Sequence, residues 1–84
     1  MITIASKAAK QRCMISDFIG VQCQDEPIDG IKASMRMETL WGLSIDWHEF
    51  AAVLATYAIH GKAEILPNRG PDNFTVYRVK GILA

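Results

Sequence analysis

An apolar stripe in the second half of the chain predicts its clearest helix. Apolar side chains recur at spacings of three and four residues, at Trp47, Phe50, Ala51, Leu54, Tyr57 and Ala58, and therefore share one side of a helix. Asp46 and Glu49 fit a capping box at its start. Gly61 fits the glycine that commonly ends a helix. We therefore expect a helix over residues 47–60.

The last part of the chain alternates apolar and polar residues as the strands of a β-hairpin do. With residues 67–72 as the loop, Ala63 lies opposite Val76 on an apolar face, and Tyr77 belongs to the polar face. The loop is rich in proline, glycine and asparagine, which form turns and do not continue a ladder. We expect the loop to protrude, with Arg69 near its tip.

The beginning of the chain has a weaker pattern. Residues 4–19 place apolar side chains on one side of a helix and lysines on another, and Gly20 is the expected end. The tripeptide Val21-Gln22-Cys23 that follows could add a short strand.

Residues 28–41 fit either a hairpin or a helix. Apolar and polar residues alternate from Ile31 to Met37, and Asp29-Gly30 is a favoured hairpin turn. In that hairpin, however, the apolar face would meet glutamine and glutamate side chains, and Pro27 would lie within a strand. A helix instead gathers four residues on one side, Ala33, Met37, Leu40 and Trp41, and uses good helix formers. We favour the helix.

The composition limits what the chain can do. It has 84 residues, half of them hydrophobic, with nine Lys+Arg against nine Asp+Glu and a formal net charge of zero. This size indicates a single domain over residues 1–84, with little room for a deep active-site cavity. The longest mainly apolar run, residues 50–59, is about half of the roughly 20 residues that cross a bilayer. We also expect no secretion signal, because residues 1–7 lack a basic stretch followed by an unbroken apolar block. We expect a cytoplasmic protein without a membrane partner.

The chemically reactive residues form no familiar motif. Cys13 and Cys23 lack the Cys-x-x-Cys spacing and a nearby histidine, so we expect buried free thiols and no metal site. There is no glycine-rich phosphate loop and no nucleophile motif. We therefore expect no enzymatic activity and no cofactor. Trp41 and Trp47 are expected in the core, because a small domain needs large side chains to fill it.

The predicted order is helix, short strand, helix, a Gly42-Leu43-Ser44 turn, helix, strand, protruding loop and strand. This order and the Gly-apolar-Ser turn resemble a winged helix-turn-helix domain, with residues 62–80 as the wing. The resemblance implies an α+β fold of three helices and a C-terminal β-hairpin. It also implies binding to duplex DNA, with helix 47–60 in the major groove and the wing against the backbone or minor groove.

The charge distribution bears on that implication in two ways. No lysine or arginine lies between Arg36 and Lys62, so the helix that would read DNA has no cation, although arginine or lysine to guanine is the commonest specific contact. The charge is nevertheless segregated: residues 1–16 carry +3, residues 17–29 carry −4, and residues 60–84 carry +2. A DNA footprint would exist if the basic residues of the wing and of the N-terminal helix shared one face.

Two functional hypotheses follow. The first is a small DNA-binding regulator of phage or plasmid type, acting as a dimer. Its candidate DNA-contacting residues are Ser44, His48, Thr56, Lys62, Asn68, Arg69, Arg78 and Lys80. The second is a protein-interaction module or inhibitor on the same fold, which would cover its surplus apolar residues by a homodimer or a protein partner instead of binding DNA.

Overall fold

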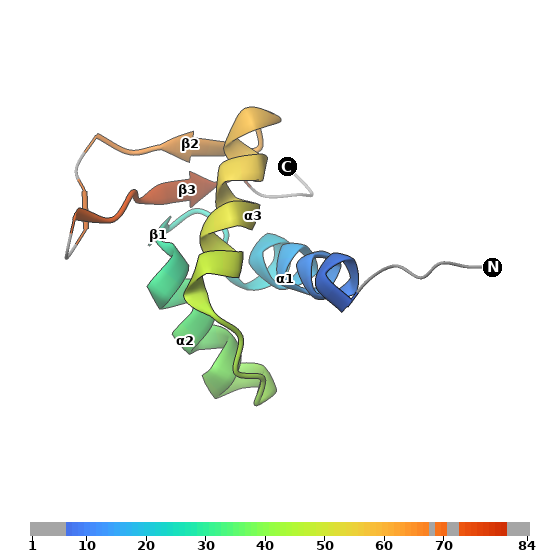
Figure 1. The fold of residues 1–84 in the computed structure, drawn as a ribbon. Helices are drawn as coiled ribbons and strands as arrows, with labels where there is room; N and C mark the ends of the chain where they lie inside the picture. Colours follow the sequence, from blue (N-terminus) through green and yellow to red (C-terminus); the bar gives the residue numbers. More distant parts are fainter. Residues whose placement is uncertain (1–6, 68, 71–72, 81–84) are drawn as a thin grey trace.

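The chain folds into three helices and a three-stranded antiparallel sheet, which is the expected α+β class (Figure 1). A computed structural model describes residues 7–67, 69–70 and 73–80. The elements are α1 (Lys7–Gln22), β1 (Pro27–Ile28), α2 (Gly30–Trp41), α3 (Trp47–Ile59), β2 (Ala63–Ile65) and β3 (Tyr77–Val79). The strand order β1-β3-β2 puts β3 in the middle of the sheet. This arrangement is compatible with a winged-helix-like domain.

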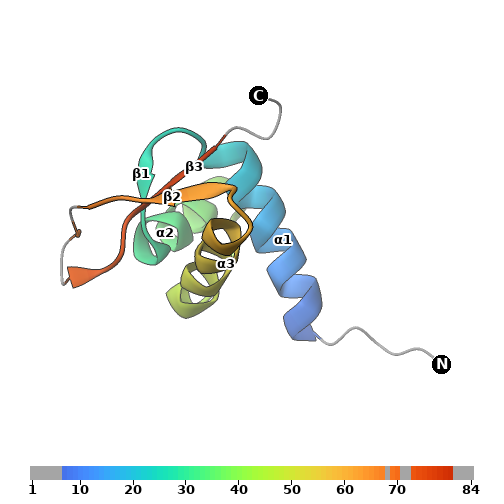
Figure 2. The same ribbon diagram turned by 90° about the horizontal axis from the view of Figure 1, so that it is seen from above.

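The core lies where α3 meets the other elements. Helix α3 contacts α1, α2, β2 and β3, and Figure 2 shows α2 and α3 together on one side of the sheet. The fully buried large side chains come from every layer: Ile15, Phe18 and Ile19 of α1, Ile28 of β1, Met37 of α2, Phe50 and Leu54 of α3, and Val79 of β3. The apolar stripe that predicted α3 is therefore the stripe that packs.

Helix α3 begins and ends where the sequence predicts. Asp46 is its N-cap, and the Asp46 side chain accepts a hydrogen bond from the backbone N–H of His48. Gly61 follows the helix with a φ of 74°, a left-handed conformation that glycine adopts without strain. Glu49 does not complete the capping box, because its carboxylate Oε1 lies 3.7 Å from Arg12 Nε of α1.

Helix α2 confirms the helical alternative for residues 28–41. Its N-cap is Asp29, whose carboxylate accepts from Lys32 N at 2.8 Å. Pro27 nevertheless lies in a strand. It is tolerated there because β1 is a two-residue edge strand and Pro27 is its first residue.

Helix α1 extends beyond its expected end, so the predicted strand at residues 21–23 is wrong. The helix continues through Gly20 to Gln22, and Cys23 N still donates to Ile19 O at 3.1 Å. Ile15, Ile19 and Cys23 are all fully buried at a spacing of four residues, so burial of this row favours continuing the helix. Residues 4–6 lie outside the described part of the chain.

The predicted register of the hairpin is also wrong. Ala63 pairs with Val79, and Glu64 pairs with Arg78, a shift of three positions from the predicted pairing. An odd shift moves the partner strand's side chains to the other face, so Tyr77 and Val79 are buried. The physical reason is that β3 is the central strand, pairing with β1 as well as β2, and the observed register turns Tyr77 and Val79 into the core.

Three residues expected in the core lie elsewhere. Cys13 is exposed, whereas Cys23 is buried. Trp41 is the last residue of α2 and is 42% exposed, with its ring meeting the Phe18 ring edge-on at 4.9 Å. Trp47 is half-buried and packs against Phe74. The core is instead made mainly from aliphatic, phenylalanine and tyrosine side chains of the three helices and the sheet.

An ion pair joins the segment after α1 to α2. The Arg36 guanidinium donates to both carboxylate oxygens of Glu26, at 2.7 and 2.8 Å, and to the carbonyl of Gln22 at 2.9 Å. The hydrogen bonds from Arg36 hold the pKa of Glu26 below its usual value. This bidentate geometry fixes the loop that leads into β1.

Candidate nucleic-acid interface

One strip of α3 remains open to solvent. His48, Ala52, Thr56 and Ile59 follow one another at helical spacing and are all exposed, with Ile59 at 81%. They lie opposite the buried residues of the same helix, which are Phe50, Val53, Leu54 and Tyr57. We call these four exposed residues the α3 strip.

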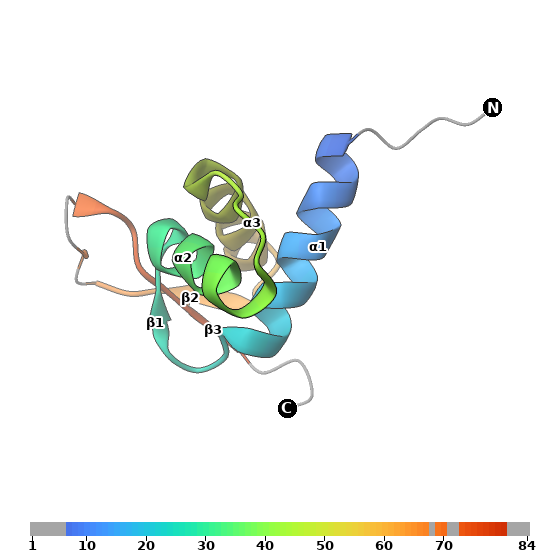
Figure 3. The ribbon, with the colours of Figure 1, turned by 90° about the horizontal axis from the view of Figure 1, so that it is seen from below.

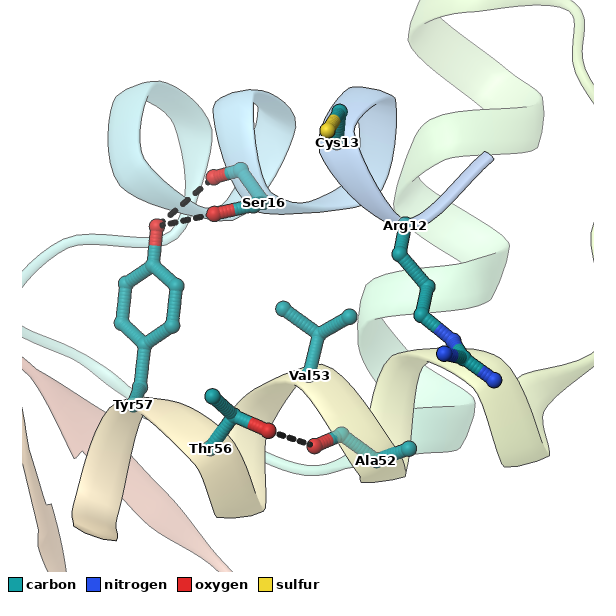
Figure 4. Close-up of a pocket in the computed structure, with 7 residues that line it drawn as sticks. All are labelled: Arg12, Cys13, Ser16, Ala52, Val53, Thr56 and Tyr57. Atoms are coloured by element: carbon teal, nitrogen blue, oxygen red, sulfur yellow. Dashed lines mark hydrogen bonds between the residues drawn. The ribbon is translucent and has the colours of Figure 1, made fainter. Parts of the chain in front are cut away.

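Helix α1 borders the strip on one side. A pocket of about 330 Å³ lies between the two helices, lined by Arg12, Cys13, Ser16, Ala52, Val53, Thr56 and Tyr57 (Figure 4). The Tyr57 hydroxyl closes one end of it by donating to the carbonyl of Ser16 at 2.7 Å. Arg12 stands at the other end beside Glu49, so this border carries a cation.

The loop between β2 and β3 packs against the start of α3. We call residues 66–76 the wing loop. The rings of Trp47 and Phe74 meet edge-on with centroids 4.7 Å apart, which fixes the loop against the start of α3. The loop also approaches α2 closely, because a Cβ on Gly70 would lie 3.3 Å from Asp29 Oδ2. Figure 3 shows α3 between the wing loop and α1.

Arg69 is the cation of the wing loop. Its Nη1 donates to Asn73 O at 3.1 Å and to Thr75 Oγ1 at 3.2 Å, while the residue stays exposed. These contacts orient the guanidinium without neutralising its charge. Asn68, the other residue predicted at the tip, lies outside the described residues.

The loop before α3 brings Ser44 close to α1. Ser44 is exposed and lines a hollow of about 390 Å³ together with Lys10, Gln11, Met14, Leu43 and Ile45. Gly42 makes this turn possible with a φ of 70°, and its N–H bonds Glu38 O. The predicted Gly-apolar-Ser turn therefore leads into α3 beside a lysine of α1.

Three of the predicted contact residues lie on a different face. Ala63, Tyr77 and Val79 point into the core, so Lys62, Arg78 and Lys80 point to the outer face of the sheet, away from the helices. Lys80 N donates to Lys62 O at 2.9 Å, which places these two residues side by side. These three basic residues therefore do not converge with those of α1, and Arg69 of the wing loop is the remaining described cation of the hairpin.

Acidic groups reduce the positive charge at the start of α3. The His48 ring contacts Asp46 Oδ1 at 3.0 Å and stacks on Trp47 with centroids 3.8 Å apart. Hydrogen bonds from His48 lower the pKa of Asp46, so this carboxylate is ionised near neutral pH. Anions at a helix N-terminus stabilise the helix, but they do not attract phosphate. The groups suited to phosphate binding are therefore the cations of α1 and the wing loop.

The predicted contact residues on α3 were polar, and two apolar residues of the α3 strip were not among them. Ala52 and Ile59 belong to the α3 strip beside the predicted His48 and Thr56. Thr56 Oγ1 donates to Ala52 O at 3.0 Å, so its hydroxyl is turned back onto the helix. Both positions could have been found from the sequence, because they lie on the side of the helix opposite the apolar stripe that packs.

In the part of the chain that the structure describes, no helix is long and apolar enough to cross a bilayer, and no group of three or more metal-ligating side chains is found. No protein family, curated protein or solved structure matches the chain.

Proposed function

We propose that this chain is a small DNA-binding regulatory protein with a winged helix-turn-helix fold, in which α3 enters the major groove and the wing loop lies against the DNA backbone. One observation carries the proposal: the α3 strip is exposed, Arg12 of α1 lies beside the helix, and the loop that carries Arg69 packs against the start of the helix through Phe74 and Trp47. A helix about 10–12 Å wide fits a major groove about 12 Å wide, so flanking cations would meet the phosphates on either side.

The roles of the residues follow from their positions. Arg12, Lys10 and Arg69 contact phosphates, which supply much of the affinity of such proteins. Ser44 and His48 lie at the start of α3, where side chains reach base edges or the adjoining backbone. Lys62, Arg78 and Lys80 have no direct role, because they belong to the outer face of the sheet.

The experiment is a fluorescence anisotropy titration of a labelled random-sequence duplex at low salt, repeated at rising salt. Few phosphate contacts predict weak binding with a shallow slope, because each contact contributes about 0.9 to the dependence of log affinity on log salt. Saturable binding with a slope of about two to three supports the proposal. No binding at the lowest salt contradicts it.

A second candidate function is protein interaction through the end of α2. Leu40, Trp41 and Leu43 are exposed by 54%, 42% and 36% within four residues of chain. Aromatic and leucine side chains exposed together favour association with another protein surface, a second copy included. Light scattering over a range of concentrations tests this function by measuring the molar mass. If a dimer forms through this surface, Trp41→Lys should have a lower molar mass than the wild type. A wild type that is monomeric at every concentration argues against a dimer.

A further inference from the structure

Strand β2 has backbone groups that point to an open edge of the sheet. It is an edge strand, with β3 on its other side (Figure 1). Leu66 N and Lys62 O each form a hydrogen bond of 2.9 Å with a residue that flanks β3. Because these directions alternate along an antiparallel strand, the N–H and C=O groups of Ala63 and Ile65 point away from β3. Among the described residues, none accepts a hydrogen bond from these two N–H groups.

The charges of β2 are complementary to those of a second copy of the same strand. An open edge can pair with another strand. Lys62 and Glu64 are exposed on the outer face of the sheet, on the two sides of Ala63. When two copies pair antiparallel about a two-fold axis, residues on opposite sides of the axis face each other. An axis at Ala63 therefore places Lys62 of each copy opposite Glu64 of the other.

The neighbouring registers are unfavourable. The outward backbone groups belong to odd-numbered positions, so an odd position must face an odd position of the other copy. An axis at position 62 or 64 meets this condition, but it places Lys62 opposite Lys62 or Glu64 opposite Glu64, and like charges directly opposite are destabilising. An axis at Ile65 places Ala63 opposite Pro67, which has no N–H to donate. The axis at Ala63 avoids all three faults.

The exposed isoleucine of β2 fits the same register. Ile65 lies on the same side of the strand as Ala63, but it is 60% exposed, whereas Ala63 is 7% exposed. With the axis at Ala63, Ile65 faces Gly61 of the other copy, where the lack of a side chain leaves room for it. The second copy would therefore cover part of an isoleucine that is mostly uncovered in the single chain.

We propose that β2 pairs antiparallel with β2 of a second copy of this chain, about a two-fold axis at Ala63, so that the two sheets become one. This surface is separate from the one proposed for DNA, and the pairing does not depend on DNA binding. It also offsets a like-charge contact. Lys80 N donates to Lys62 O within each copy, which places two lysines side by side, and Glu64 of the other copy brings an opposite charge to Lys62.

The dimer is expected to be weak and dependent on concentration, because β2 has only three residues and short interfaces belong to transient complexes. A change at one position alters two contacts, since the axis repeats each of them. Reversing the charge of Lys62 or Glu64 turns both attractive contacts into repulsive ones. Each reversal should therefore raise the dissociation constant about tenfold.

The test is sedimentation equilibrium of the whole chain at low salt, with the variants Lys62→Glu and Glu64→Lys measured separately and as an equimolar mixture. In the mixture, the acidic strand of one variant faces the basic strand of the other, so both contacts are attractive again. The matched control is the pair Lys10→Glu and Glu38→Lys, which makes the same charge changes at exposed positions of α1 and α2. Circular dichroism checks that each variant is folded.

The proposal predicts a reversible dimer of the wild type, about tenfold weaker dimers of Lys62→Glu and of Glu64→Lys, and a mixture of the two that associates at least as tightly as the wild type. The control variants, alone or mixed, should associate as the wild type does. A wild type that is monomeric up to about 1 mM overturns the proposal, and so does a mixture that associates no better than its components. A dimer that Trp41→Lys weakens and the β2 variants do not would place the contact at the end of α2 instead. None of these outcomes bears on DNA binding, which the anisotropy titration tests separately.

Discussion

The hydroxyl of Tyr57 in α3 donates a hydrogen bond of 2.7 Å to the backbone carbonyl of Ser16 in α1, and it accepts one of 3.2 Å from the hydroxyl of Ser16. Tyr57 is 8% exposed, so water competes little for these bonds. They join the two helices beside the α3 strip. The position of Arg12 relative to α3 therefore depends on this contact.

Replacing Tyr57 by phenylalanine should destabilise the fold by about 1 kcal/mol, because a half-buried hydrogen bond is lost and its partners stay in place. Urea unfolding followed by circular dichroism measures this. Ser16→Ala is the matched control: it removes only the weaker of the two bonds and should have a smaller effect. Equal stability of wild type and Tyr57→Phe would show that the contact contributes nothing.

Gly30 marks the closest approach of α2 to α3. A Cβ at this position would lie 2.8 Å from the carbonyl oxygen of Trp47 and 3.1 Å from Ala51 Cβ. Gly30→Ala should therefore destabilise the fold by about 1–3 kcal/mol, since backbone must move. Thr39→Ala, at an exposed position of the same helix, should change stability by no more than about 0.5 kcal/mol. A neutral Gly30→Ala would contradict this packing of the two helices.

The two cysteines should react at very different rates. Cys13 is exposed and Cys23 is buried, and burial raises the pKa of the Cys23 thiol, which further lowers its thiolate fraction. An aromatic disulfide reagent at neutral pH should modify one thiol rapidly in the folded protein and the second only after unfolding. The Cys13→Ser variant should show no rapid phase. Two rapid phases in the wild type would contradict the burial of Cys23.

Acid should weaken the contact between Glu26 and Arg36. The hydrogen bonds from Arg36 lower the pKa of Glu26 in the folded state below its usual value of 4.5. The stabilisation is therefore fully present above that value and is lost as the pH falls through the lower folded-state pKa. The wild type should have a higher free energy of unfolding than Glu26→Gln. This difference should be constant at neutral pH and shrink below about pH 4.5. A difference independent of pH down to pH 2 would show that the ion pair does not stabilise the fold.

Local patterns predicted the helices well. Helix α3 has its cap at Asp46, its stripe and its ending glycine within one stretch of sequence, so nothing distant was needed to place it. The hairpin register was not predictable in this way. It depends on β1, which pairs with the far side of β3, and no property of the hairpin alone reports that third strand.

The candidate interface was predicted only in part. His48 and Thr56 are exposed on α3, but the basic residues of the wing divide between Arg69 in the wing loop and Arg78 and Lys80 on the outer face of the sheet. An odd shift of register moves a strand residue to the other face of the sheet. The wrong register therefore could not show which basic residues lie on the outer face. The role of Arg12 depends on how α1 crosses α3, which is a tertiary feature.

The central claim is that DNA binds on the face formed by the α3 strip, Arg12 and Arg69. The most direct measurement compares two double variants of equal net charge: Arg12→Gln with Arg69→Gln, and Arg78→Gln with Lys80→Gln. Both should unfold at temperatures close to that of the wild type, since all four side chains are exposed.

In anisotropy titrations of the same duplex over a range of salt concentrations, the first double variant should lose most of its affinity. Its slope of log affinity against log salt should fall by about two, as two phosphate contacts disappear. The second double variant should bind within about twofold of wild type. Equal losses in the two double variants, or a larger loss in the second, would contradict the claim that this face binds DNA.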